Sequence, residues 1–239
     1  MDLPGYVALT RQSGLAGEMQ SVANNIANLA TTGYRREGVI FAEEVQALPA
    51  EGGSVAMTEA RARYTDTLQG SLEETGGSLD LAIEGDGYFT VLTPQGERLT
   101  RAGAFTRNAE GTVVTMDGHP LLDEGGSEIV IPFETKAISV ATDGTLSLDG
   151  APAAKIGLVK PTDPTKVSRE AGTLFKATAT EPMEGPRVVQ GFLEQSNVNP
   201  IAEMARMVEV QRAYEYGQKL MDQEDERIRL VVRTLGQLG

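Results

Sequence analysis

Residues 21–34 read SVANNIANLATTGY, a stretch in which a helical pattern of apolar residues is interrupted by asparagines. The apolar positions, which recur at the spacing of one helix face, are Val22, Ile26 and Leu29. The interrupting positions are Asn24, Asn25 and Asn28. Each Asn costs about 0.5 kcal/mol relative to Ala in a helix interior, so we expect groups outside the helix to compensate for them.

The helical pattern extends from this stretch over residues 4–30. Its apolar residues alternate spacings of four and three, which is the pattern of a coiled-coil seam. The seam consists of Leu15, Met19, Val22, Ile26 and Leu29. We expect the helix to end at Gly33, because glycine readily adopts the left-handed conformation that closes helices. On a helical wheel the asparagines lie opposite or beside the seam, facing either water or another protein surface.

A second, longer helix is predicted from Pro200 to the C-terminus. Asn199 suits the N-cap, Pro200 the first helical position, and Glu203 is an acid in the first turn. The seam of this helix comprises Met207, Val210, Tyr214, Gly217, Met221, Glu224, Ile228, Val231, Leu235 and Leu238. Gly217 and Glu224 interrupt its apolar character. The two seams predict a coiled-coil-like module formed by the chain ends.

Between the two helices the pattern changes twice. Residues 37–78 contain two glycine pairs, a proline and no sustained period, which predicts an extended connector with brief strands. Residues 79–195 show short apolar runs separated by turn signals, which predicts a mainly antiparallel β domain. The predicted fold class is therefore α+β, with terminal helical segments at residues 1–36 and 196–239 around a central β-rich domain.

The charge of the chain is unevenly distributed. Its formal net charge of −13 lies within residues 37–200, while both ends are nearly neutral and could crowd together in many copies. The acidic balance argues against nucleic acid or anionic lipid as a partner. No apolar run is long enough to span a bilayer, and the N-terminus lacks the pattern of a secretory signal peptide. We expect no direct membrane insertion.

The sequence offers no reactive constellation. Cysteine is absent and His119 is the single histidine, which excludes thiolate and multi-histidine metal sites. Motifs of nucleotide binding and of hydrolases are missing. We expect no catalytic residue, metal or cofactor, and an assembly component rather than an enzyme. A periplasmic enzyme acting on the cell wall and a soluble coiled-coil adaptor are the alternatives.

Three stretches resemble bacterial flagellar rod and hook proteins. They are VANNIANLATTGYRRE at residues 22–37, the β region of residues 76–122, and SNVNPIAEMARMVEVQRAYE at residues 196–215. The order and placement of the two terminal motifs make the resemblance specific. Within the family, the length and the C-terminal sequence most resemble the proximal rod members, with the distal rod members as the alternative.

The resemblance implies a structural subunit of the basal-body rod, which polymerises through its terminal helices into a shaft that transmits torque across the periplasm. The implied partners are copies of itself, other proximal and distal rod subunits, and the flagellar type III export apparatus, with no cleaved signal peptide. The resemblance assigns subunit packing to Asn24, Asn25, Asn28, Gly33, Tyr34, Asn197, Asn199, Gln211, Arg212, Ala213 and Tyr214. We expect the amides to hydrogen-bond neighbouring subunits.

Overall fold

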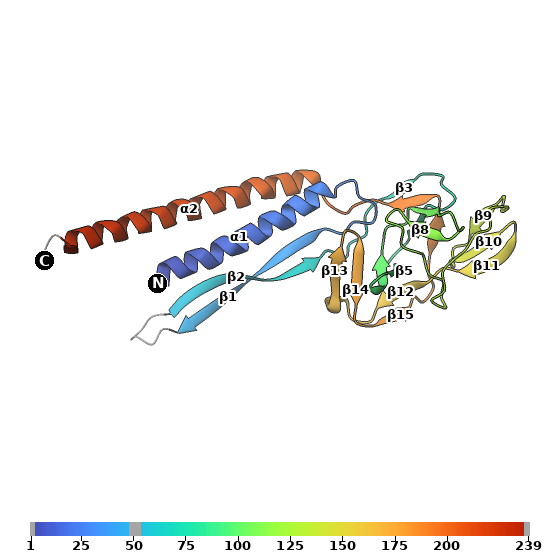
Figure 1. The fold of residues 1–239 in the computed structure, drawn as a ribbon, viewed down its shortest axis with the longest axis horizontal. Helices are drawn as coiled ribbons and strands as arrows, with labels where there is room; N and C mark the ends of the chain where they lie inside the picture. The colour runs from blue at the N-terminus through green and yellow to red at the C-terminus, as the bar shows by residue number, and fades with distance from the viewer. Residues whose placement is uncertain (1–2, 48–53, 237–239) are drawn as a thin grey trace. The chain divides into compact units, whose positions relative to one another are not determined.

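The computed structural model describes residues 3–47 and 54–236. Within these ranges it places the side chains of residues 8–40 and 63–234. The chain divides into two compact units, and Figure 1 labels their elements. Each unit has its own packing.

The helical unit combines described parts of residues 1–27, 37–66 and 199–239. Its elements are α1 (Leu3–Ala27), β1 (Glu37–Ala47), β2 (Ser54–Thr65) and α2 (Pro200–Gly236). Helix α1 contacts α2 and both strands of the antiparallel β1–β2 hairpin. Figure 1 shows α1 between α2 and the hairpin. The unit is therefore built around α1.

The structure agrees with the α+β class, but the prediction of a coiled-coil-like module of the terminal helices is wrong. A coiled coil needs each helix to direct one seam at the other, whereas α1 packs on the hairpin as well as on α2. Strands β1 and β2 contain 11 and 12 residues, where the sequence predicted a connector with brief strands. The hairpin supplies the second surface that α1 covers.

Helix α1 ends at Ala27 and does not continue to Gly33 as expected. Gly33 has a φ of +70° and donates its backbone N–H to the Glu194 carbonyl oxygen at 2.7 Å. A Cβ atom at this position would lie 2.3 Å from the Ala102 nitrogen. Gly33 therefore permits a close backbone approach inside the β unit instead of capping the helix.

The start of α2 confirms the predicted cap. Asn199 Oδ1 accepts hydrogen bonds from the backbone N–H groups of Ile201 and Ala202 at 3.0 and 3.1 Å. Pro200 occupies the first helical position, where its missing N–H costs nothing. The helix contains 37 residues and is about 55 Å long at 1.5 Å per residue.

The β unit comprises residues 28–36 and 67–198 and is mainly antiparallel, as predicted. Its strands are β3 (Leu72–Glu74), β4 (Leu81–Ile83), β5 (Tyr88–Thr93), β6 (Gly96–Thr100), β7 (Phe105–Arg107), β8 (Val113–Thr115), β9 (Ile138–Val140), β10 (Thr145–Leu148), β11 (Ala151–Lys155), β12 (Leu158–Pro161), β13 (Val167–Ala171), β14 (Leu174–Ala177), β15 (Thr180–Pro182), β16 (Val188–Gln190) and β17 (Phe192–Glu194). A 3₁₀ turn, η1 (Pro164–Lys166), precedes β13.

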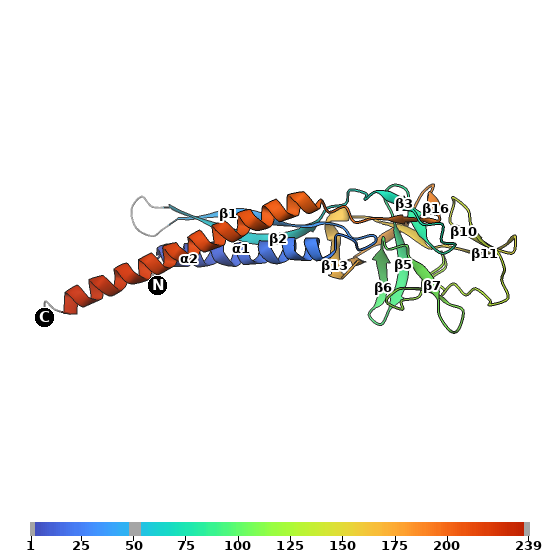
Figure 2. The same ribbon diagram turned by 90° about the horizontal axis from the view of Figure 1, so that it is seen from above.

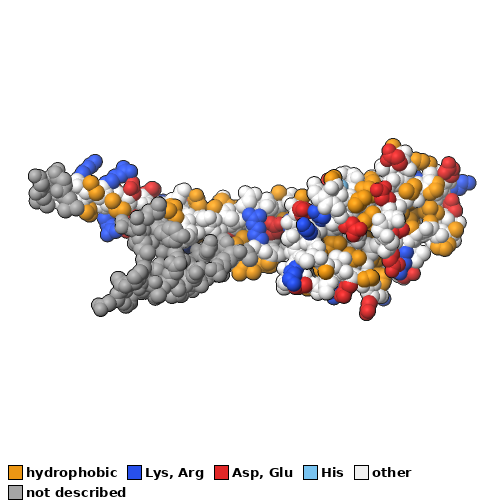
Figure 3. Space-filling view, turned by 60° about the horizontal axis from the view of Figure 1, so that its bottom comes forward, with side chains coloured by type: hydrophobic (Ala, Val, Ile, Leu, Met, Phe, Trp, Pro, Cys, Tyr) orange, Lys and Arg blue, Asp and Glu red, His pale blue; other side chains and the backbone are white. Residues whose placement is uncertain are grey.

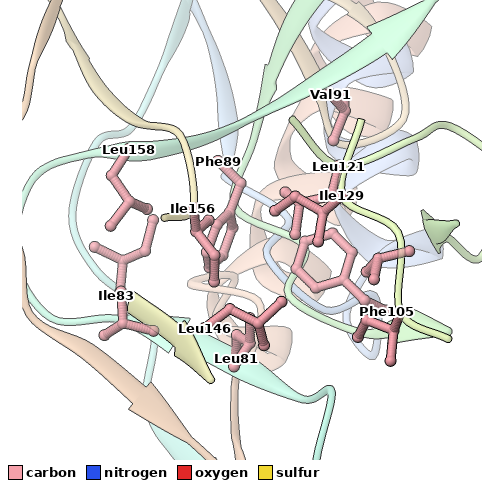
Figure 4. Packing of buried hydrophobic residues seen from close by; sticks show 13 residues of the cluster. Leu81, Ile83, Phe89, Val91, Phe105, Leu121, Ile129, Leu146, Ile156 and Leu158 are labelled. Carbon is pink, nitrogen blue, oxygen red and sulfur yellow. The ribbon is translucent and has the colours of Figure 1, made fainter. Parts of the chain in front are cut away.

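The largest sheet of the β unit has the strand order β13-β14-β6-β5-β12-β15, and a smaller one has the order β11-β10-β9. Pairs β16-β4, β17-β3 and β7-β8 complete the described sheets. Thirteen buried apolar residues form the core, and Figure 4 shows ten of them labelled. Phe89 and Phe105 meet edge to face with ring centroids 5.3 Å apart. The short strands therefore share a packed interior.

Candidate assembly site

The predicted seam of α1 lies at buried and half-buried positions. Val22 is 4% exposed. The half-buried members are Leu15, Met19, Ile26 and Leu29. Their burial is consistent with packing inside this chain, although Leu29 follows the end of α1 and belongs to the β unit.

The predicted seam of α2 is covered only in its first half. Val210 is 2% exposed, and Met207, Tyr214 and Met221 are half-buried. Ile228 and Val231, further along, are exposed. Leu235 lies in the helix, but its side chain is outside the described set.

Contacts of three residue pairs among the described side chains show how α1 and α2 pair. They are Gln12 Nε2 to the Tyr214 carbonyl oxygen at 2.9 Å, Arg206 Nε to Glu18 Oε1 at 2.6 Å, and Asn25 Nδ2 to Glu203 Oε2 at 3.1 Å. In these contacting pairs the residue number rises along α1 while it falls along α2, so the two helices are antiparallel. Both ribbon views show them side by side (Figures 1 and 2).

The same register leaves the end of α2 without cover from α1. It places Leu3, the first described residue of α1, opposite the segment around Gln223. Beyond that point α2 continues to Gly236, with no described residue of α1 facing it. Leu230 and Val232 in this segment are exposed. The last turns of α2 therefore expose apolar side chains around the helix.

Asn25 is fully buried and hydrogen-bonded within the chain. Its Nδ2 donates to the Glu37 carbonyl oxygen at 2.8 Å and to Glu203 Oε2 at 3.1 Å, while its Oδ1 accepts from the Glu37 N–H at 2.8 Å. This amide thus joins α1 to the start of β1 and to the first turn of α2. The hydrogen-bond partners of Asn25 therefore lie in its own chain, and not in neighbouring subunits as expected.

The other two asparagines also have partners inside the chain. Asn24 Oδ1 accepts from Gln20 Nε2, and Asn28 Oδ1 accepts from Thr31 Oγ1, both at 3.0 Å. These two side chains are half-buried. That they bind further subunits stays a prediction.

We expect Asn25→Ala to lower the free energy of unfolding of the helical unit by about 1–3 kcal/mol. The buried N–H and carbonyl of Glu37 lose a partner, a cost that outweighs a helix-propensity gain of about 0.5 kcal/mol. Asn24→Ala is the matched control, because the contact of Asn24 with Gln20 is exposed. Urea denaturation followed by circular dichroism measures both, and equal stability of the two variants would contradict the role of Asn25.

The two terminal motifs meet inside the β unit at Asn197. Its backbone N–H donates to the Tyr34 carbonyl oxygen at 3.3 Å, and its Oδ1 accepts from the Arg36 N–H at 2.6 Å. Its Nδ2 donates to the Leu68 carbonyl oxygen at 2.9 Å. One side chain therefore connects three segments that are distant in the sequence.

A buried charge cluster lies beside this junction and was missed from the sequence. Glu194, 1% exposed, places Oε1 2.7 Å from Arg35 Nη2 and Oε2 3.2 Å from Arg101 Nη1. Arg101 also donates to the Ile83 carbonyl oxygen at 3.2 Å and lies over the Tyr88 ring, 5.3 Å from its centroid. Burial lowers the pKa of Arg101 and raises the pKa of Tyr88. The spacing of these residues gives no signal of the cluster.

Tyr34 is held by an arginine that the sequence analysis also missed. The Arg169 guanidinium lies 4.3 Å from the Tyr34 ring centroid and 4.8 Å from that of Phe175. It also donates to the Arg35 carbonyl oxygen. Tyr34 is 2% exposed, so its anchoring, like that of Asn25, is within the chain.

The outer face of α2 remains open in the single chain, and of its five residues the sequence analysis assigned only Gln211 to subunit packing. We use this name for Ile201, Met204, Val208, Gln211 and Glu215, which follow one another at spacings of three and four and so share one side of the helix. All five are exposed, and the neighbouring Arg212 is exposed as well. Ile201 reaches 79% and Met204 56% exposure. On a helical wheel the centre of this face lies about 130° from the buried residues Glu203 and Val210.

The described residues hold no group of three or more His, Cys, Asp or Glu side chains placed to bind a metal ion. Neither described helix is long and apolar enough to cross a membrane. Figure 3 shows acidic side chains spread over the visible face of the β unit. The polar clusters around Asn25, Asn197 and Glu194 make their contacts within this chain and stabilise its fold.

Two family models match the chain. Residues 82–148 match the flagellar hook protein FlgE/F/G D1 domain, and residues 189–233 match the flagellar basal body rod FlgEFG protein C-terminal region. The first match lies in the β unit and the second ends within α2. These matches define the class as flagellar rod and hook proteins.

The full-length relatives narrow the class. The chain is 41% identical to the flagellar basal-body rod protein FlgF of Caulobacter vibrioides over 100% of both chains, and 36% identical to that of Mesorhizobium japonicum over 97% of both. It is 29% identical to the rod protein FlgG of Bacillus subtilis, over 95% of this chain and 97% of that protein. The chain belongs to the family of flagellar basal-body rod proteins FlgF, which are structural components of the flagellar basal body.

Proposed function

We propose that the chain packs into the basal-body rod, against copies of itself and other rod subunits, through the outer face of α2. The observation that carries this proposal is the exposure of Ile201, Met204 and Val208 on a helix that α1 already covers on another face. Fully burying one such side chain contributes about 1.5–3 kcal/mol. The same three side chains in every subunit would be buried repeatedly along a polymer.

The last turns of α2 extend this packing surface. Ile228, Leu230, Val231 and Val232 are exposed on several sides of the helix. A helix that is apolar around its circumference is typical of a buried position, and this segment has no such cover from α1. We propose that neighbouring rod subunits surround it. The nearly neutral charge of both chain ends favours such crowding.

The family places the chain in the basal body, and we propose the proximal part of the rod, with the distal part as the alternative. Identity to the FlgF relatives exceeds identity to FlgG of Bacillus subtilis, which supports this choice. In this position the subunit would transmit torque across the periplasm. The export route would be the flagellar type III apparatus, and retention of the chain in the cytoplasm of cells lacking that apparatus would test it.

We propose that the chain has no catalytic role. The single histidine, His119, lies beside the turn at Gly118, and its backbone N–H donates to Thr115 Oγ1. The absence of cysteine and of recognisable catalytic motifs supports the same view. A cell-wall hydrolase is the alternative. Release of fragments from peptidoglycan by the purified chain, abolished by substituting one carboxylate of the β unit, would establish that alternative.

We expect Met204→Asp to abolish rod assembly and swimming without unfolding the chain. Met204 is 56% exposed in the monomer, so a carboxylate is tolerated there, but it would be buried without a counter-charge in the rod. Met116→Asp, at a side chain 77% exposed in the β unit, is the matched control. Swimming in soft agar and the yield of isolated basal bodies are measured. Normal swimming of the Met204→Asp strain would exclude the outer face of α2 from packing.

A further inference from the structure

A groove of about 300 Å³ opens between α1 and α2 within the helical unit. Apolar side chains that line it include Leu15 from α1 and Leu220 from α2. The groove is also lined by Gln12, Gly217 and Arg11. The Arg11 side chain is exposed. The groove is therefore apolar, with one amide and one positive charge.

Gly217 determines how Gln12 packs at the groove. The glycine interrupts the apolar seam of α2, and it disfavours the helix relative to alanine. A Cβ atom on Gly217 would lie 2.8 Å from Gln12 Nε2, which donates to the Tyr214 carbonyl oxygen at 2.9 Å. The missing side chain lets the Gln12 amide lie directly against α2, in the place that a Cβ atom would take.

Gln12, which lines this groove, carries a buried acceptor without a partner among the described residues. Its side chain is 7% exposed, and its Oε1 atom has no hydrogen-bond partner among the described residues. A buried carbonyl without a donor is unfavourable, so the Gln12 side chain would gain from turning its carbonyl towards an occupant that brings a donor. Arg11 likewise pairs with no acid among the described side chains, so an acidic group on the occupant would be favourable.

We propose that this groove receives the outer face of α2 from a second copy of this chain. Val208, Gln211 and Glu215 follow one another at three and four residues, so they form one ridge that matches the groove. Val208 supplies an apolar side chain, the Gln211 amide a donor for Gln12 Oε1, and Glu215 a counter-charge for Arg11. This inference rests on the proposed packing function and names the surface that the outer face meets.

The proposed contact is heterologous, because the groove and the outer face are different surfaces of the same chain. Such a contact leaves one groove and one outer face free at the two ends of every assembly. It therefore repeats into an open helical polymer, and it does not stop at a closed dimer. That property is what a rod subunit requires.

Single cysteines test the contact cleanly, because the chain has none of its own. Cells that express both Arg11→Cys and Glu215→Cys chains are oxidised, and their basal bodies are isolated. Since each chain carries one thiol, a disulfide between the two positions must join two copies. We expect a dimer band from the mixture and none from either variant alone. A mixture of Arg11→Cys with Met116→Cys is the control, and it is expected to give no dimer.

The outcomes separate this inference from the function on which it rests. Both chains present in basal bodies, but without a dimer band, would overturn the groove contact and leave the packing function standing. Absence of the wild-type chain from basal bodies would overturn both.

Reversing the two charges is a second, independent test of the same contact. Arg11→Glu and Glu215→Arg are each expected to impair swimming when expressed alone. Their co-expression is expected to restore it, because opposite charges then face each other between unlike copies. Failure of the mixture to restore swimming would overturn the proposal.

Discussion

Replacing Glu194 with Gln is expected to lower the free energy of unfolding of the β unit by about 3–5 kcal/mol. Arg35 and Arg101 are 1% and 3% exposed, and Glu194 is the carboxylate that neutralises both. Without it, two like charges remain close together in a poorly solvated interior. Glutamine keeps the size of the side chain, so the decrease in the free energy of unfolding comes from the lost charge and not from a change in volume. Urea denaturation followed by circular dichroism gives the difference.

Glu84→Gln is the matched control for this experiment. Glu84 pairs with Arg187 at 3.2 Å, but the two side chains are 48% and 75% exposed. An exposed pair contributes about 0–1 kcal/mol, so this variant is expected to unfold almost like the wild-type chain. A Glu194→Gln variant as stable as Glu84→Gln would show that the buried cluster does not hold the junction together.

Gly33→Ala is expected to cost about 3 kcal/mol or more in the stability of the β unit. The left-handed φ of +70° disfavours any side chain, and a Cβ atom would meet backbone atoms of Arg101 and Ala102 at 2.3 Å. Backbone cannot move aside as a flexible side chain can. The hydrogen bond from the Gly33 N–H to the Glu194 carbonyl oxygen is expected to break as the chain shifts.

Gly76→Ala separates the two causes of that loss. Gly76 has a φ of +71°, almost the same as Gly33, but a Cβ atom there meets nothing within 4 Å. This variant is expected to cost only about 1 kcal/mol, from the left-handed backbone alone. Thermal unfolding of both variants gives the comparison. Equal losses would mean that the close approach at Gly33 is unimportant.

The sequence predicted the elements whose signals are local. The cap of α2 follows from Asn199 and Pro200, whose effects act within one helical turn. The antiparallel β domain follows from short apolar runs between glycine turns. The β1–β2 hairpin was predicted only as brief strands, since its register shifts between Ile40 and Phe41 and so breaks the alternation that marks a strand.

The candidate site was predicted less completely, because its polar contacts join residues that are far apart in the sequence. Glu203 was interpreted as a favourable acid in the first turn of α2, yet it is 1% exposed and binds Asn25. The seam pattern likewise could not show that α1 faces two surfaces. Gly217 was identified as an interruption, but only the packing of Gln12 against it reveals a groove.

Cryo-microscopy of isolated basal bodies tests the central claim most directly, since it shows what covers α2 in the assembled rod. We predict that density for this chain lies in the rod, with the outer face of α2 buried against neighbouring subunits. The side chains to follow are those of Ile201, Met204 and Val208, which are exposed in the single chain. A rod in which these three side chains face an open channel or solvent, with no protein density against them, would contradict the account.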